Sequence, residues 1–210
     1  MKFSKSCKIL ICCLLSILLL ITPTSFAEEY EQIKEYEYEN FRYTIINENE
    51  IEILGFVDSS IHTGVLEIPS EIDGKKVTTI GEYAFQGCNL SGGVVFPNTI
   101  TKIKVGAFNA CQIKGRILIP ESVTEIESVA FWGNNMLTRI EINNTSEIAE
   151  DAFDSTVAIV GEKNSYAETY ALETERIFID ISNVIYENGI GYKLDQENNI
   201  YKIVDYQDTE

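Results

Sequence analysis

The sequence predicts a repeat solenoid, mostly β-strand with short turns and 3₁₀ segments, wound as a right-handed coil and closed by an N-terminal β-hairpin. The pair Ala-Phe recurs at 84–85, 107–108, 130–131 and 152–153, with spacings of 23, 23 and 22 residues. An isoleucine stands five residues before each of these phenylalanines, and a proline follows a strand-like run at positions 69, 97 and 120. A fixed period of 20–30 residues is typical of a solenoid, in which each unit buries its apolar face only against its neighbours.

Each unit begins with a short run rich in β-branched residues. These runs are Val-Val-Phe at 94–96, Ile-Leu-Ile at 117–119 and Ile-Glu-Ile at 140–142. Because alternate residues of a strand share a face, the first and third members should point inward and the middle one outward. The phenylalanine that comes later in each unit should lie in the core. We expect Gly92 and Gly115 to form the sharp return to the next strand.

The segments VTTIGEYAFQGC at 77–88 and VTEIESVAFWGN at 123–134, each bracketed by such strands, resemble the BspA-type leucine-rich repeat. The resemblance covers residues 65–178, with a terminal unit at 157–178. It implies a leucine-rich-repeat-like coil in a surface or secreted protein that binds host or neighbouring-cell proteins. The chain departs from the pattern at Asn134, which replaces a cysteine, and at Asn143, which replaces a proline. The final repeat is also one residue short, which suggests a register that decays toward the C-terminal end.

Residues 1–27 are typical of a secretory signal peptide, with three early lysines, an apolar run at 9–21 and small residues at Ser25 and Ala27. The run has 13 residues, which is short of the roughly 20 that a membrane span needs. Cleavage after Ala27 would shift the net charge from −17 to −20, because the segment holds three lysines and no acidic residue. The alternative is a membrane anchor.

This strongly acidic mature chain should repel nucleic acids and anionic lipids, so neither is an expected partner. We expect an extracellular monomer, either secreted or associated with the cell surface, with no membrane insertion after cleavage. Cys88 and Cys111 are the only cysteines outside the signal segment and are 23 residues apart. Stacked turns would allow a disulfide between them, but free thiols are predicted because the slot recurs as a small apolar position.

The segments that flank the array are predicted from charge and alternation. Residues 28–40 hold six glutamates and one lysine, which indicates a flexible acidic lead. Residues 41–64 predict a β-hairpin that caps the array. Residues 179–210 resemble that cap, with Tyr192 matching Tyr43. The alternative is an unrelated C-terminal hairpin of similar β-propensity.

No catalytic, cofactor-binding or metal-binding constellation is present in the sequence. His62 is the only histidine and lies in a polar loop without a nucleophile context. One histidine and two cysteines do not supply the four ligands of a usual zinc site. We therefore expect no enzyme activity and no cofactor; the alternative is a hydrolase with an unrecognised site.

A candidate partner-binding face follows from the outward positions of the strands. That column reads Glu67, Val95, Leu118, Glu141 and Ala158. Its apolar centre is edged by Arg116 and Arg139, a composition expected of an interaction patch on an acidic molecule. Trp132 should be partly exposed around the turn from this face. The alternative is that two exposed aliphatic residues are ordinary surface.

The expected function is binding of an extracellular protein, of the host or neighbouring-cell adhesion type, without catalysis. The alternative is a passive structural spacer or an assembly component of the cell surface.

Overall fold

The computed structural model describes residues 33–58, 63–142, 147–182, 184–187, 190–195 and 200–206, the last three stretches mostly as backbone. Residues 34–210 form one compact unit. The predicted signal peptide at 1–27, His62 and Asn143 lie outside the described residues. None of the described helices is long and apolar enough to cross a membrane.

A three-stranded antiparallel meander opens the unit: β1 (Glu35–Tyr38), β2 (Phe41–Asn47) and β3 (Glu50–Phe56). The predicted hairpin is therefore confirmed. The acidic lead was predicted to be flexible as far as residue 40, which is wrong for 35–38. The reason is the Glu-Tyr alternation of β1, which places Tyr36 against Tyr43 with ring centroids 5.4 Å apart and directs Glu35 to Arg42. The net charge of the segment concealed this β pattern.

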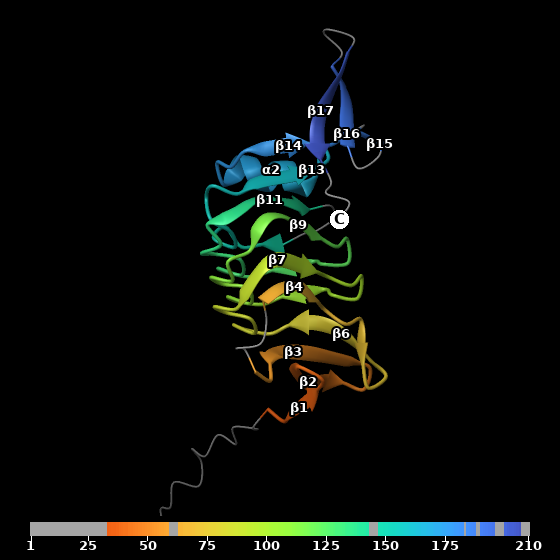
Figure 1. Cartoon of the computed structure of the whole chain (residues 1–210), viewed down its shortest axis with the longest axis vertical. Helices are drawn as coiled ribbons and strands as arrows, with labels where there is room; N and C mark the ends of the chain where they lie inside the picture. Colours follow the sequence, from red (N-terminus) through yellow and green to blue (C-terminus); the bar gives the residue numbers. More distant parts are fainter. Residues whose placement is uncertain are drawn as a thin grey trace, which may run out of the picture. The chain divides into compact units, whose positions relative to one another are not determined.

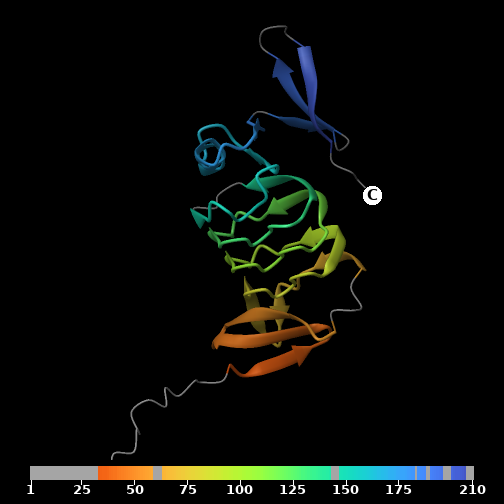
Figure 2. The same ribbon diagram turned by 90° about the vertical axis from the view of Figure 1, so that its left-hand side faces the viewer.

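The array consists of two stacks of parallel strands. One stack continues the meander: β3 pairs with β6 (Lys75–Ile80), followed by β8 (Lys102–Ile103), β10 (Glu125–Ile126) and β12 (Glu147–Ile148), with β5 (Glu71–Ile72) antiparallel to β6. The other stack contains β4 (Thr63–Glu67), β7 (Asn89–Val95), β9 (Lys114–Ile119), β11 (Met136–Ile142), β13 (Ala158–Gly161) and β14 (Phe178–Asp180). Figures 1 and 2 show these strands following one another in sequence order. The ladder of the second stack is interrupted between β7 and β9. The predicted mostly-β solenoid is confirmed.

The core of the array is a column of phenylalanines, all 0–1% exposed. Phe85 stacks on Phe108 with centroids 5.3 Å apart, and Phe108 stacks on Phe131 at 5.1 Å. Edge-on rings close the column at both ends: Phe56 meets Phe85 at 4.8 Å, and Tyr170 meets Phe153 at 6.1 Å. The inward strand residues Ile117, Ile119, Ile140 and Ile142 are also buried, as the alternation predicts.

A polar column runs beside the phenylalanines. The thiol of Cys111 donates to the carbonyl of Phe85 at 2.9 Å, and one period later the amide Nδ2 of Asn134 donates to the carbonyl of Phe108 at the same distance. Asn134 is 0% exposed, and its Oδ1 accepts the backbone N–H of Ile113 at 3.0 Å. Asn134 thus takes over the bond that the cysteine makes, and the substitution is no sign of a decaying register.

Both array cysteines are buried and free, as predicted. Burial raises the pKa of the Cys111 thiol to about 12. Because the thiolate is the reactive form, this thiol should be unreactive while the protein is folded.

The turns between the stacks contain two columns of left-handed backbone that the residue pattern does not predict. Tyr83, Gly106 and Val129 share one slot, with φ of 52°, 60° and 49°. Gly87, Ala110 and Gly133 share the other, with φ of 72°, 55° and 80°. Each column repeats with the period of the array, so these left-handed positions mark the turns.

Gly92 and Gly115 do not form the return turns, contrary to the prediction. They lie within β7 and β9. A side chain on Gly92 would come within 2.7 Å of the backbone of Gly64 and Val65, so glycine is required for the close approach of β7 to β4. Gly115, with φ of 70°, lies beside the register shift between β9 and β11.

The terminal unit contains β13, helix α2 (Tyr166–Glu173) and β14. Ala167, Tyr170 and Ala171 are the buried residues of α2. The hydroxyl of Tyr170 donates to the carbonyl of Ala149 at 3.1 Å, and this buried ring covers the last phenylalanine. The helix therefore closes the apolar column.

A second meander follows: β15 (Ile185–Glu187), β16 (Ile190–Asp195) and β17 (Ile200–Tyr206). Its backbone repeats the first meander. Tyr36 pairs with Tyr43 in the first copy, and Ile185 pairs with Tyr192 at the equivalent positions of the second. The bulge after Arg42 recurs after Gly191. Paired residues of β16 follow those of β2 by 149 residues, and those of β17 follow those of β3 by 150. The likeness of tail and cap therefore extends to the strand register of the described residues.

Candidate protein-binding face

The candidate face is the outer side of strands β7, β9 and β11. In the register of β9 and β11, Leu118 pairs with Glu141 and Arg116 pairs with Arg139. Val95 lies at the corresponding position of β7, beyond the break in the ladder. Val95 is 55% exposed and Leu118 is 49% exposed, so the apolar centre of the predicted column does face solvent.

The predicted column is wrong at its C-terminal end. The residue aligned with Glu141 is Val160, and Ala158 instead aligns with Arg139. The spacing from Glu141 to Val160 is 19 residues, against 23 from Leu118 to Glu141, so the period of the array does not locate the outward residue of β13. The outward exposure also ends here: Glu141 is 9% exposed and Val160 is 4% exposed.

An open groove of about 810 Å³ runs over this face. The described residues that line it come from β7, β9, β11, β13 and β14, and they are Gly92, Val94, Lys114, Gly115, Arg116, Leu118, Thr138, Arg139, Ala158 and Ile179. The groove thus brings together Leu118 and the two predicted arginines. Val95 and Trp132 do not line it.

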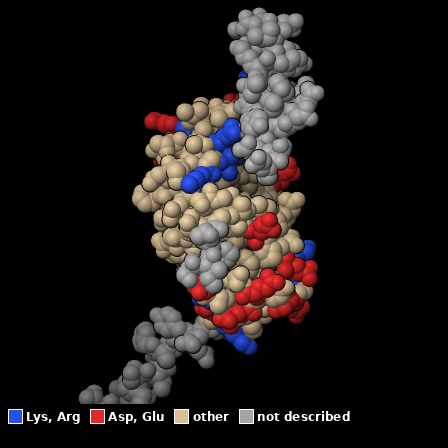
Figure 3. All heavy atoms as spheres, in the orientation of Figure 1, with Lys and Arg blue, Asp and Glu red and all other residues tan. Residues whose placement is uncertain are grey.

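The groove is basic, although the chain carries a net charge of −17. Its described lining holds Lys114, Arg116 and Arg139 and no carboxylate. Glu141, next to the groove, forms an ion pair with Arg116 with Nη2 and Oε2 2.5 Å apart. Both side chains are mostly buried, at 11% and 21% exposure, so this pair holds the guanidinium in place more firmly than a surface ion pair would. Figure 3 shows basic side chains gathered over the strands of the groove and acidic ones over the first meander.

Trp132 is 52% exposed, as expected of a turn position. Its backbone carbonyl accepts the N–H of Ala110, and its own N–H donates to the carbonyl of Val129. The residue is therefore fixed in a turn between the two stacks. It is not part of the groove.

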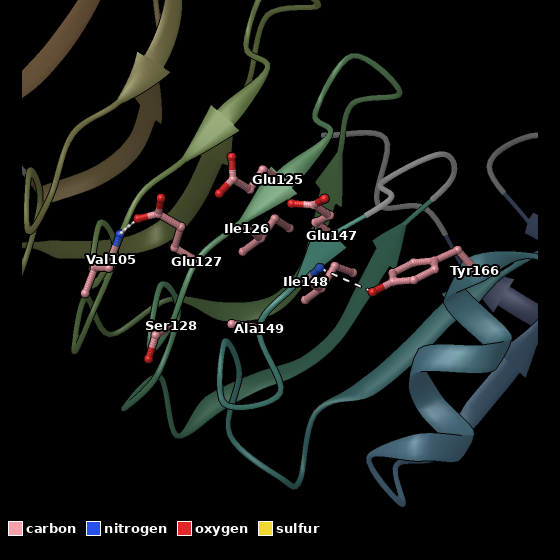
Figure 4. Close-up of a pocket in the computed structure, with 9 residues that line it drawn as sticks. All are labelled: Val105, Glu125, Ile126, Glu127, Ser128, Glu147, Ile148, Ala149 and Tyr166. Carbon is pink, nitrogen blue, oxygen red and sulfur yellow. Dashed lines mark hydrogen bonds between the residues drawn. The ribbon is translucent and has the colours of Figure 1, made fainter.

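A second hollow, of about 510 Å³, lies over the small strands β10 and β12. Figure 4 shows Glu125, Glu127 and Glu147 there, with the hydroxyl of Tyr166 accepting the N–H of Ile148 at 3.3 Å. Lys102 bridges Glu125 and Glu127 at 2.9 and 2.6 Å. Burial opposes ionisation of Glu127, but the bond from Lys102 and the N–H of Val105 lower its pKa overall.

The ion pairs at this second hollow join Glu125 and Glu127 to Lys102, which is not among its described lining residues. Among the described residues, no group of three or more His, Cys, Asp and Glu side chains could hold a metal ion.

Comparison with known proteins identifies the repeat. The model of the BspA type Leucine rich repeat region matches residues 59–161 in six copies. No curated protein matches the chain significantly.

One solved structure shows the same fold, and two others are similar in part. A leucine-rich repeat protein from Bacteroides capillosus is 21% identical, with a TM-score of 0.52 over 60% of this chain and 97% of its own. A leucine rich cell surface protein from Faecalibacterium prausnitzii is 14% identical, with a TM-score of 0.30 over 83% of this chain and 62% of its own. The T. pallidum leucine-rich repeat protein is 17% identical, with a TM-score of 0.30 over 60% of this chain and 86% of its own. The phenylalanine column, the period of the array and the family match agree, and the chain therefore belongs, through residues 59–161, to the BspA-type leucine-rich repeat family.

Proposed function

We propose that this protein is a secreted or surface-displayed binding module that engages an extracellular protein, of the host or neighbouring-cell adhesion type, through the groove over β9 and β11. The proposal contains no catalytic step. The observation that carries it is the half-exposed Leu118 beside three basic side chains of one groove.

Two physical arguments support this choice of face. An apolar side chain at the centre of a polar rim is the usual composition of an interface, and arginine is enriched there. Most residues that line the groove come from β9, β11, β13 and β14, which form one continuous ladder, so their backbone positions are fixed by the ladder and the core. A preformed surface binds with less loss of conformational entropy than a loop does.

Secretion is supported by the lysines, the apolar run and the small residues of segment 1–27. A secreted product should begin at Glu28, and N-terminal sequencing of the exported protein tests this directly. An intact Met1 on the exported protein would contradict cleavage after Ala27.

The binding role is tested with the mature chain, immobilised and exposed to extracellular-matrix and cell-surface protein fractions. Leu118→Glu is compared with Leu172→Glu, since both leucines are exposed, at 49% and 69%, but Leu172 lies on α2 outside the groove. A protein retained by the parent and by Leu172→Glu, but lost with Leu118→Glu, supports the proposal. Equal retention by both variants at unchanged melting temperature would exclude this face, and absence of any retained protein would favour the spacer role.

A further inference from the structure

We infer that the groove accepts an extended peptide segment of the partner that carries carboxylate and aliphatic side chains two residues apart. The inference rests on the proposed function and adds to it the chemistry of the partner. It depends on the basic lining of the groove, on the position of Leu118 and on the geometry of the strands beneath.

The charge of the groove differs from that of the rest of the molecule. Lys114, Arg116 and Arg139 line it, and no carboxylate is among its described lining residues. Glu141 lies beside the groove, in its ion pair with Arg116. The lining is therefore basic in a chain of net charge −17. A carboxylate is the complementary group, and guanidinium groups favour carboxylates geometrically as well as electrostatically.

The overall negative charge of the protein does not prevent this binding. Screening at physiological salt reduces interactions between exposed charges beyond about 8 Å. A carboxylate inside the groove therefore responds mainly to the nearby charges, which are Lys114, Arg139 and the ion pair of Arg116 with Glu141. The distant glutamates slow the approach of an acidic partner more than they weaken the final contact.

The spacing of the two kinds of side chain is set by β9. Arg116 and Leu118 are two residues apart on the same face of this strand. In an extended segment, side chains on one face repeat about every 6.8 Å, twice the rise of a strand residue. A segment that lies along β9 can therefore place a carboxylate near Arg116 and Arg139 and an aliphatic group against Leu118 at the same time.

The test uses a fluorescein-labelled peptide with the repeat Glu-Thr-Ile-Thr, which presents both side chains in either direction, and a second peptide with Gln for Glu. Anisotropy is measured with the mature protein, with Lys114→Gln and with Lys163→Gln. The two lysine variants lose the same charge, but Lys163 is exposed in a turn outside the groove.

We expect the Glu peptide to bind the parent at least about tenfold more tightly than the Gln peptide, and less tightly as salt increases. Lys114→Gln should weaken binding about three- to tenfold, and Lys163→Gln should leave it unchanged. Equal binding of the two peptides, absence of binding, or equal loss in both lysine variants would overturn the inference. If a partner is captured through Leu118 but the Glu peptide has no advantage, the proposed function stands and this inference falls.

Discussion

The inner column of the array repeats the same residue in each turn, whereas the outer strand face changes its residue from turn to turn. Inside, Phe85, Phe108 and Phe131 recur without change and stack at 5.1–5.3 Å. Outside, the corresponding strand positions hold Glu67, Val95, Leu118, Glu141 and Val160 in turn. Each inner side chain touches copies of itself, so the same shape must be repeated. Glu67, Val95 and Leu118 are exposed to solvent or a partner, so their chemistry can vary from one turn to the next, whereas Glu141 and Val160 are buried.

This difference separates stability from binding in a way that single substitutions can test. Changes in the inner columns should alter the free energy of unfolding, and changes on the outer face should alter binding alone.

The largest effect is expected at the centre of the inner column. Phe108→Ala should lower the free energy of unfolding by about 3–5 kcal/mol, because the ring is fully buried between two others. Urea denaturation followed by circular dichroism measures this, with Val95→Ala as the exposed control. Phe153 is 1% exposed and meets Tyr170, so its removal should cost a similar amount. If Phe108→Ala unfolds like the control, the inner column is not the source of stability.

A smaller loss of stability is expected from a substitution in the polar column. Asn134→Ala leaves the N–H of Ile113 and the carbonyl of Phe108 without their side-chain partner in the core. An unsatisfied buried group costs about 1–3 kcal/mol, and the loss should be of that order. Asn134→Cys restores the residue of the two preceding repeats and should recover part of it. Identical denaturation midpoints for the Ala and Cys variants would contradict a hydrogen-bonding role of this slot.

Substitutions at the left-handed turn positions can raise the stability of the protein as well as lower it. Ala110 has φ of 55° between Gly87 and Gly133, which share its slot. Ala110→Gly should stabilise the protein by about 0.5–1 kcal/mol, because glycine adopts this conformation without strain. Gly87→Ala, the reverse substitution in the same slot, should destabilise the protein by about 1 kcal/mol. Thermal melts of both variants compare the two, and shifts in the same direction would show that backbone conformation does not govern this column.

The smallest effect on stability is expected on the outer strand face. Leu118→Glu should change the free energy of unfolding by less than about 0.5 kcal/mol, since the side chain is half-exposed. A loss above about 2 kcal/mol would show that Leu118 belongs to the folded core, and the distinction between the two regions would fail there.

Sequence periodicity was sufficient for the inner columns because they repeat by physical necessity. The isoleucines five residues before the phenylalanines, the phenylalanines themselves and the outward direction of Val95 and Leu118 were all predictable. Periodicity failed where the spacing between strands falls from 23 to 19 residues, so that Val160 and not Ala158 aligns with Glu141. It also could not show that Asn134 replaces a thiol donor, because that depends on which carbonyl lies one turn below. The groove itself arises from side chains of five strands, and no local pattern describes it.

Net charge predicted the structure less reliably than sequence periodicity did. It predicted a flexible segment at 35–38, where alternating tyrosines form a strand instead. It also concealed the basic groove, which contains only three of the 16 basic residues of the chain.

The repeated meander bears on how the array is joined to its cap. In the first copy, β3 joins the array through parallel backbone pairing with β6, from Glu50 opposite Lys76 to Ile53 opposite Ile80. The second copy keeps the same strand order and the same bulge, and in the described residues β17 pairs with β16 alone. A junction made by backbone pairing is independent of most side chains. The pairing of β3 with β6 therefore depends on a free strand edge more than on the side chains of either strand.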